Sequence, residues 1–283
     1  MLARRSPANA GRRRASREEY LSLLWERDAS RGRCFQERHG SRAPRYGRAP
    51  HHDSSPFCQP EEHGAKRSAS RRLMRYPTHM DFVVLSSSKG TTFQAVLDAI
   101  ASKSLTANLK GLVTDRFERG CVAKAKDAGV PVRVVKKKIG EHRELYDQRI
   151  DEAIRALLQS GQSQTSSLIP QNSFVVCIGW MFLLSSWFVR HWKNHILNVH
   201  PSLLPKHPGA HAHELVLASK DAESGMTIHL IDEGLDTGKI LVQKKCSVLP
   251  TDTVDTLKAR VQALECEWYP KLLEQIQRGD VDL

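Results

Sequence analysis

The feature that most constrains the fold is a regular alternation that begins at residue 81. Short apolar runs rich in β-branched residues, of which residues 81–86 are the first, alternate with segments whose apolar residues recur at helical spacing. A strand followed by a helix and another strand is typical of a βαβ unit, whose strands lie parallel in one sheet. The sequence therefore predicts an α/β fold with a mostly parallel sheet.

The same pattern places the remaining elements. Further strands are expected at residues 109–113, 130–135, 174–178 and 195–200, and helices at residues 92–102, 119–128 and 141–158. Residues 226–231 and 239–248 are predicted to be paired strands around a turn at residues 232–238. A long C-terminal helix is predicted over residues 253–278, and Pro270 is expected to kink or break it.

Residues 1–79 differ from the rest of the chain in charge. They contain 18 Lys and Arg against 8 Asp and Glu, whereas residues 80–283 contain 25 against 23. Their apolar residues are sparse outside residues 20–25, a candidate short helix, so the segment buries too little apolar surface to offset its ordering entropy. We therefore predict a disordered, arginine-rich extension at residues 1–79 and one folded domain at residues 80–283.

Three roles for the N-terminal extension are open. An Arg- and Ser-rich N-terminus is typical of an organelle transit peptide, although its eight acidic residues argue against one. A basic arm of this kind also binds nucleic acid without sequence preference. The third alternative is a dispensable extension or a misplaced start, because Met74 and Met80 both stand just before the first predicted strand.

The composition, with 40% hydrophobic and 26% charged residues, is that of a globular protein. The longest apolar run, at residues 174–184, has 11 residues, whereas a membrane span needs about 20. The six cysteines form no CxxC pair and no Cys/His ligand spacing, so neither a disulfide scaffold nor a zinc site is expected. We predict a cytoplasmic protein that binds no metal and no membrane.

The first candidate site is the loop at residues 86–92, between the first strand and the first helix. Its small residues expose backbone N–H groups at the helix N-terminus to an anion, Lys89 adds a positive charge, and Gly90 allows close approach. The loop contains neither GxxxxGK[ST] nor GxGxxG, so neither a P-loop nor a dinucleotide site is favoured. The loop predicts a phosphate site, with an ordinary strand-to-helix turn as the alternative.

The second candidate site lies where the strand at residues 195–200 ends. Asn198 and His200 are two residues apart and therefore face the same side of the strand, at the edge where parallel sheets bind ligands. An amide can donate to an oxyanion, and an imidazole can carry a proton near neutral pH. A carboxylate from the acidic turn at residues 232–238 would orient His200. The alternatives are a structural histidine and a solvated turn.

Three motifs in order along the chain carry a resemblance to a known family. They are ILNVHPSLLPKHPG at residues 196–209, DEGLDTG at residues 232–238 and ARVQALECEWYP at residues 259–270. Residues 81–278 thereby resemble the glycinamide ribonucleotide formyltransferases, the folate-dependent enzymes of the third step of purine synthesis. The resemblance implies a formyltransferase fold with a Rossmann-like N-terminal half, and it implies that residues 80–283 are the catalytic domain.

The resemblance also implies roles for individual residues. The implied catalytic residues are Asn198, His200 and Asp236. The residues implied to bind glycinamide ribonucleotide are Lys89, Gly90, Thr91, Thr92, Phe93, Arg260, Gln262 and Glu265. The residues implied to bind folate are Arg143, Met181, Phe182, Leu183, Leu184, Asn198, Asp232, Glu233, Gly234 and Leu235.

The chain departs from the family's pattern in two places. In the phosphate loop, usually GxGSN, Ser88 replaces the first glycine and Thr91 and Thr92 replace the Ser-Asn pair, while Gly90 is retained. In the folate segment, usually Gly-Phe-Met-Arg-Ile-Leu, Phe182 replaces the arginine. Backbone contacts to both substrates are expected to survive these changes, whereas a contact from the arginine side chain is lost.

The implied reaction transfers the formyl group of 10-formyltetrahydrofolate to the amine of glycinamide ribonucleotide. Two enzymes on the same core are alternatives: formyltetrahydrofolate deformylase, which has an N-terminal regulatory domain, and methionyl-tRNA formyltransferase, which has a C-terminal barrel domain. This sequence predicts neither extra domain. An inactive nucleic-acid-binding protein is the non-enzyme alternative, and the presence of all three catalytic residue types argues against it. The sequence indicates no oligomeric state.

Overall fold

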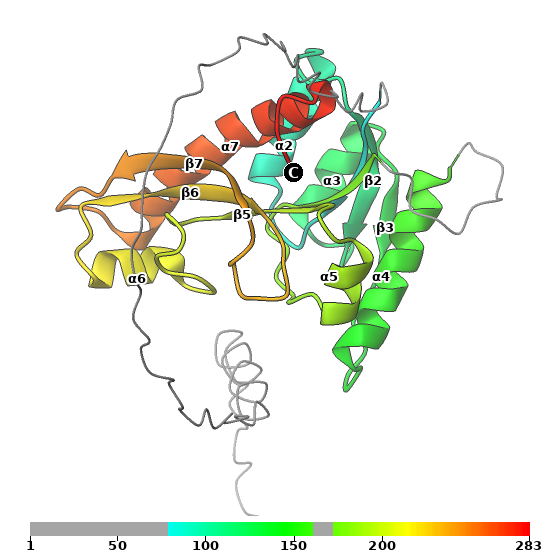
Figure 1. The fold of residues 1–283 in the computed structure, drawn as a ribbon, viewed down its shortest axis with the longest axis horizontal. Helices are drawn as coiled ribbons and strands as arrows, with labels where there is room; N and C mark the ends of the chain where they lie inside the picture. The colour runs from blue at the N-terminus through cyan, green and yellow to red at the C-terminus, as the bar shows by residue number, and fades with distance from the viewer. Residues whose placement is uncertain (1–78, 161–171) are drawn as a thin grey trace, which may run out of the picture. The chain divides into compact units, whose positions relative to one another are not determined.

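One seven-stranded sheet organises the described part of the chain, which comprises residues 79–160 and 172–283 of a computed structural model (Figure 1). The strand order is β3-β2-β1-β4-β5-β6-β7. The strands are β1 (Asp81–Leu85), β2 (Asn108–Thr114), β3 (Val132–Val134), β4 (Ser173–Cys177), β5 (Ile196–His200), β6 (Glu223–Leu230) and β7 (Ile240–Ser247). Strands β1 to β5 run parallel, whereas β6 is antiparallel to both β5 and β7.

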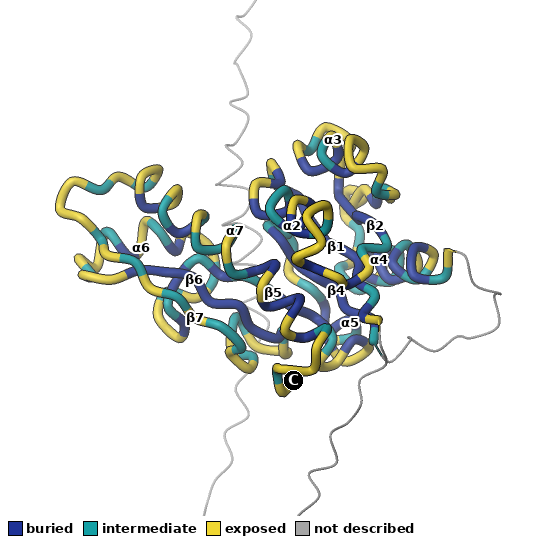
Figure 2. The backbone as a smooth tube through the Cα atoms, turned by 90° about the horizontal axis from the view of Figure 1, so that it is seen from above, coloured by how far each residue is buried: buried dark blue, intermediate teal, exposed yellow. Residues whose placement is uncertain are grey.

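Helices cover both faces of the sheet. They are α2 (Thr91–Ala101), α3 (Gly120–Asp127), α4 (Arg143–Leu158), α5 (Ser186–His191), α6 (Ala212–Ala218) and α7 (Val254–Arg278). Because successive side chains of a strand alternate between faces, Phe82 and Val84 of β1 join the apolar cluster beneath α2, α3 and α7. Val83 joins the cluster beneath α4 and α5. Figure 2 shows β1, β4 and β5 buried between these layers.

The predicted α/β fold with a mostly parallel sheet is confirmed. The two short helices α5 and α6 were not predicted, because segments of six and seven residues are too short to show a clear helical period. The expected break at Pro270 is wrong, since α7 continues through it to Arg278. Proline removes one backbone N–H from the ladder, but the buried neighbours Tyr269 and Leu272 anchor this part of α7 in the core.

Some expectations fall outside the described residues. These are the disordered extension, except for its last residue, and the short helix at residues 20–25. Within the described ranges, no helix is long and apolar enough to cross a membrane. The four cysteines that the structure describes, Cys121, Cys177, Cys246 and Cys266, are free thiols.

Candidate functional site

The candidate site lies where the parallel strands end. The loop after β1 and the loop after β4 meet there, because the backbone N–H of Ser87 donates to the carbonyl oxygen of Gly179 over 3.1 Å. Strand β4 in turn pairs with β5, where Cys177 lies opposite Asn198. Adjacent strands are about 4.8 Å apart, so the two loops and the end of β5 form one continuous edge.

His200 and Asp236 contact each other at this edge. The Nδ1 atom of His200 lies 3.3 Å from Oδ2 of Asp236, and the His200 residue is only 5% exposed. Asp236 adopts a positive φ of 53°, which turns the chain sharply, and its Oδ2 also accepts a hydrogen bond from the backbone N–H of Gly209 at 2.8 Å. The carboxylate is therefore fixed by the backbone of the loop after β5 as well as by its own turn.

The second ring nitrogen of His200 is also engaged. Its Nε2 atom lies 2.8 Å from the carbonyl oxygen of His207. Both nitrogens thus face oxygen acceptors, and a neutral imidazole has only one N–H, so only the imidazolium form donates to both. His207 itself is fixed by Asp221, whose Oδ2 lies 2.9 Å from Nε2 of His207.

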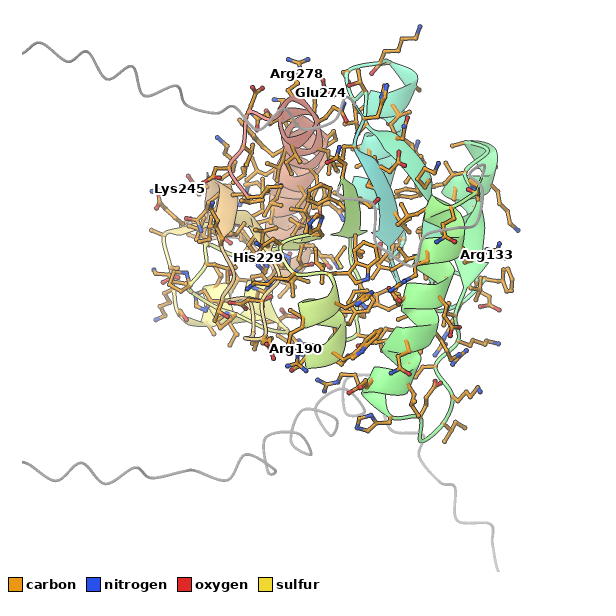
Figure 3. The ribbon with its side chains drawn as sticks, turned by 45° about the vertical axis from the view of Figure 1, so that its right-hand side comes forward. Arg133, Arg190, His229, Lys245, Glu274 and Arg278 are labelled. Carbon is orange, nitrogen blue, oxygen red and sulfur yellow. The ribbon has the colours of Figure 1, made fainter. Side chains whose placement is uncertain are left out.

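His229 is a site residue that the sequence analysis missed. It lies on β6 directly opposite Asn198 in the antiparallel pair, and it is fully buried in the interior (Figure 3). Its Nδ1 bonds to the carbonyl oxygen of Leu230 at 2.8 Å, while its Nε2 lies 3.3 Å from Nδ2 of Asn198 and 3.7 Å from Oδ1 of Asp236. Burial lowers the pKa of His229, so a neutral ring accepts a hydrogen bond from the Asn198 amide and orients it.

The predicted phosphate loop is built around Gly90. Gly90 is the N-cap of α2 with a φ of 77°, and its N–H donates to Oγ of Ser88 at 3.1 Å. The first turn of α2 contains no acidic residue of its own, and its end of the helix carries the positive pole of the helix dipole. The unpaired N–H groups of this turn are suited to an anion, and Lys89 is exposed beside them.

Thr92 and Glu265 connect this loop to the C-terminal helix. The hydroxyl of Thr92 donates to Oε2 of Glu265 over 2.9 Å, although the two residues are 173 positions apart. Burial raises the pKa of Glu265 to about 7, against smaller lowering effects from the Thr92 hydrogen bond and from the charge of Lys258. The structure therefore brings together two residues that the sequence analysis assigned to one substrate.

We expect Glu265→Gln to stabilise the protein at alkaline pH. The folded protein holds the Glu265 proton up to about pH 7, whereas the unfolded chain releases it near 4.5. The folded state binds more protons between these values, so its stability falls as the pH rises through that window. A glutamine does not titrate, so the variant should gain about 1–3 kcal/mol over wild type at pH 8 and little at pH 4.5. Urea unfolding at both pH values measures this, and an equal difference at both would contradict it.

Arg260 occupies a different position from Glu265. Its guanidinium binds both carboxylate oxygens of Asp252, at 2.7 and 2.9 Å, and the carbonyl oxygen of Ser247 at 2.8 Å. This contact lowers the pKa of Asp252 and holds the start of α7 against the end of β7. Gln262 is half-buried on the same helix, three residues before Glu265. A substrate contact from Arg260 stays a prediction, since the described structure shows its guanidinium bound within the protein.

The predicted folate segment follows β4 and presents apolar side chains to solvent. Met181 is 49% and Leu183 is 48% exposed, whereas Leu184 is half-buried. Phe182 points inward, with its ring 5.5 Å from that of Tyr146 in an edge-to-face arrangement and 5.2 Å from that of Trp180. Phe182 thus has a packing role in place of the charge that the family's arginine would bring.

The other predicted folate residues flank this segment. Glu233 accepts from Arg190 of α5, which Figure 3 labels, at 2.9 Å. The turn is closed by Asp232, whose Oδ1 accepts from the N–H of Gly234 at 3.0 Å. Leu235 is half-buried in the same turn. Arg143 is the first residue of α4, and its charge acts on the buried Asp147, which in turn accepts from the backbone N–H of Ser185 at 2.5 Å.

Among the described residues, no group of three or more His, Cys, Asp and Glu side chains has the arrangement of a metal site. The side chains that meet at this edge are an amide, an imidazole and a carboxylate. These are suited to stabilising an oxyanion and moving a proton.

Comparison with known proteins places this arrangement in a family. The formyl transferase family model matches residues 80–273. Phosphoribosylglycinamide formyltransferase of Escherichia coli (strain K12) is 30% identical over 200 residues, which are 71% of this chain and 88% of that protein. The fold is also similar to the crystal structure of glycinamide ribonucleotide transformylase 1 from Symbiobacterium toebii, with a TM-score of 0.66 and 27% sequence identity. The superposition covers 76% of this chain and 96% of that chain.

Longer proteins contain a similar segment. The trifunctional purine biosynthetic protein adenosine-3 of Bos taurus is 33% identical over 208 residues, which are 73% of this chain but only 19% of that protein. This chain therefore spans about a fifth of the length of the trifunctional relative. From the family match and the Escherichia coli relative, the chain belongs to the formyl transferase family and is related to its phosphoribosylglycinamide formyltransferases.

Proposed function

We propose that the protein transfers the formyl group of 10-formyltetrahydrofolate to the amine of glycinamide ribonucleotide, giving N-formylglycinamide ribonucleotide and tetrahydrofolate. The observation that carries this proposal is the cluster of Asn198, His200 and Asp236 at the edge of the sheet that also carries the anion-binding loop. Relatives named phosphoribosylglycinamide formyltransferase support the same substrates.

The substrate amine is the nucleophile in this reaction. Its attack on the formyl carbon gives a tetrahedral oxyanion, which the amide of Asn198 and the N–H of His200 stabilise. His200 must turn its Nε2–H from the carbonyl oxygen of His207 toward the substrate to do so. Asp236 holds the imidazolium and, through water, moves the proton from the attacking amine to the folate nitrogen that leaves. Much of the remaining rate acceleration comes from holding the two substrates close together and correctly oriented.

The two substrates would lie on either side of this cluster. The phosphate of the ribonucleotide fits the first turn of α2, with Lys89 beside it and Thr91, Thr92 and Phe93 within that turn. Glu265 would accept from the ribose hydroxyls, since its carboxyl already accepts from Thr92.

The folate would occupy the segment after β4. The buried indole N–H of Trp180 has no hydrogen-bond partner among the described residues. A buried donor of this kind calls for an acceptor, and the polar edge of a pterin supplies acceptors. The exposed side chains of Met181 and Leu183 provide apolar surface beside it.

A coupled assay of the full chain tests the proposal. The protein is incubated with 10-formyltetrahydrofolate, with and without glycinamide ribonucleotide, and both products are quantified. We expect N-formylglycinamide ribonucleotide to form in equal amount with tetrahydrofolate, and little tetrahydrofolate to form without acceptor. Formate release that does not depend on the acceptor would instead support the deformylase alternative and would overturn the proposal.

We further propose that the N-terminal extension takes no part in the chemistry. Met80 is buried in the core, and its backbone N–H donates to Oε1 of Gln277 at 2.6 Å. A truncated chain that begins at Met80 would place a charged amino terminus in this buried position, so the truncation is made at Met74. A variant that begins at Met74 should keep its fold and its kcat/KM for both substrates within about twofold, and should lose most of any binding to polyanions. A loss of more than about tenfold in kcat/KM, roughly 1.4 kcal/mol, would contradict this.

A further inference from the structure

Helix α7 runs antiparallel to the parallel strands and extends past the edge that carries the candidate site. Near its end, Oε1 of Gln277 accepts from the backbone N–H of Met80, just before β1, at 2.6 Å. Nearer its start, the hydroxyl of Tyr269 donates to the carbonyl oxygen of Cys177, at the end of β4, over 3.2 Å. Glu265 comes one turn before Tyr269. The residues that precede Glu265 therefore lie beyond the carboxyl ends of the strands, on the side where such sheets bind ligands.

Three polar residues share one face of this first part of α7. Lys258, Gln262 and Glu265 are spaced four and three residues apart, which places them one above the other on a helix. The hydroxyl of Thr92 donates to Glu265 over 2.9 Å, so this face is directed toward the first turn of α2. Arg260 lies about 200° around the helix from Lys258, and its guanidinium is bound at the end of β7. Lys258 therefore places a cation on the face that meets the predicted phosphate loop.

The charge of Lys258 acts on groups at both ends of the candidate site. Burial raises the pKa of Glu265 to about 7, and a side-chain hydrogen bond and the charge of Lys258 oppose this rise. Burial is also the main cause that lowers the pKa of His213 in α6, and the charges of Lys258 and His200 lower it further. Lys258 therefore lies between the residue that contacts the predicted phosphate loop and the cluster around His200.

Two groups in this region have no partner within the described ranges. Lys258 is exposed, and its ammonium pairs with no carboxylate there. The Nδ1 atom of His213 is buried and has no hydrogen-bond partner among the same residues. A buried ring nitrogen of this kind calls for a partner. The carboxyl group on this face of α7, that of Glu265, already accepts from Thr92. The region is therefore suited to a ligand that carries negative charge.

We propose that Lys258 binds the phosphate of the ribonucleotide from the side of α7 and thereby sets a preference for phosphorylated acceptors. This proposal rests on the proposed function. The phosphate is the negatively charged group of glycinamide ribonucleotide, so it is the part of the substrate that a lysine attracts. An ammonium group binds a phosphate as a point charge with three donors. The phosphate is then held between two helices, by the N–H groups of the first turn of α2 and by Lys258 of α7.

The experiment compares two acceptors, glycinamide ribonucleotide and its dephosphorylated form, glycinamide riboside, with the full-length protein. We expect Lys258→Gln to lower kcat/KM for the ribonucleotide at least about tenfold, mainly through a higher KM, because a charge-assisted contact to the phosphate is lost. The riboside has no phosphate, so its kcat/KM should change by less than about twofold, as should the KM for 10-formyltetrahydrofolate. Lys258→Arg keeps the charge and should recover most of the loss.

Lys271→Gln is the matched control for the lost charge. Lys271 lies on the same helix but after Tyr269, toward the opposite edge of the sheet, and pairs with Glu267 at 2.7 Å. This variant should keep the wild-type values for both acceptors. Equal losses with the two acceptors in Lys258→Gln would overturn the proposal, and so would an unchanged KM for the ribonucleotide.

A binding measurement separates this proposal from the proposed function. If the wild-type protein formylates neither acceptor, the proposed function is refuted, and titration calorimetry with ribose 5-phosphate still tests Lys258. We expect Lys258→Gln to weaken the binding of ribose 5-phosphate at least about tenfold, because the phosphate loses its ammonium partner. Equal affinity in the two proteins, or no binding by the wild type, would overturn the role assigned to Lys258.

Discussion

Replacing His200 with alanine is expected to lower kcat by at least about 10², and Asp236→Ala by a similar factor. His200 contacts Asp236 at 3.3 Å and the carbonyl oxygen of His207 at 2.8 Å, so its ring is held in place at the proposed reaction site. Loss of one oxyanion donor or acid-base group typically costs 10²–10³ in rate, or about 2.7–4 kcal/mol. Steady-state kinetics with both substrates measure the effect.

His195→Gln is the matched control for that experiment. His195 directly precedes β5 at its opposite end, where its Nδ1 lies 2.9 Å from the carbonyl oxygen of Ser173, and it has no contact with Asp236 among the described residues. We expect this variant to keep its kcat within about twofold. A correctly folded His200→Ala protein with near-normal kcat would refute the role assigned to the imidazole, and circular dichroism confirms folding in each case.

Gly90→Val is expected to raise the KM for glycinamide ribonucleotide by at least about tenfold and to change the KM for the folate by less than about threefold. A Cβ at Gly90 would lie 2.8 Å from the Cα of Cys121 and 3.1 Å from Cδ of Lys124. The φ of 77° also disfavours any side chain, above all a β-branched one. The first turn of α2 has to shift as a result, and its N–H groups then no longer converge on the phosphate.

Gly129→Val separates backbone strain from the loss of the phosphate site. Gly129 has a φ of 68°, but an added Cβ meets nothing within 4 Å, and the residue follows the C-terminal end of α3. This variant should lose about 1–3 kcal/mol of stability through strain while both KM values stay unchanged. Equal changes in the two KM values of Gly90→Val would show that the loop is a structural turn and no phosphate site.

The alternation of side chains along a strand is enough to predict one part of the candidate site, the pair Asn198 and His200. The spacing of Asn198 and His200 alone predicts that they lie on one face of β5, because side chains alternate with a period of two. The strand pattern does not predict the contact between His200 and Asp236. That contact depends on a turn 36 residues later along the chain, in which Asp236 adopts a positive φ. In this case the family resemblance supplied what local pattern lacks.

The neighbours of β5 could not be predicted, because strand order is a property of tertiary packing. His229 reaches Asn198 only because β6 pairs antiparallel with β5, which the sequence pattern of β6 does not show. The contact between Arg260 and Asp252, eight residues earlier, is likewise not visible in the sequence pattern, and the substrate role that the family resemblance implies for Arg260 stays a prediction. The continuation of α7 through Pro270 likewise follows from burial in the core, which outweighs the local cost of one missing hydrogen bond.

The hydrogen bond between Ser87 and Gly179 joins the two loops that we propose to bind the two substrates. A Cβ at Gly179 would lie 2.7 Å from Cβ of Ser88, so the loop after β1 and the loop after β4 are also in close packing contact. If the proposed sites are correct, we expect a phosphate that fixes the first loop to restrict the second, so that the two binding equilibria are coupled. Such coupling is reciprocal: the factor by which the ribonucleotide changes the affinity for folate equals the factor by which folate changes the affinity for the ribonucleotide.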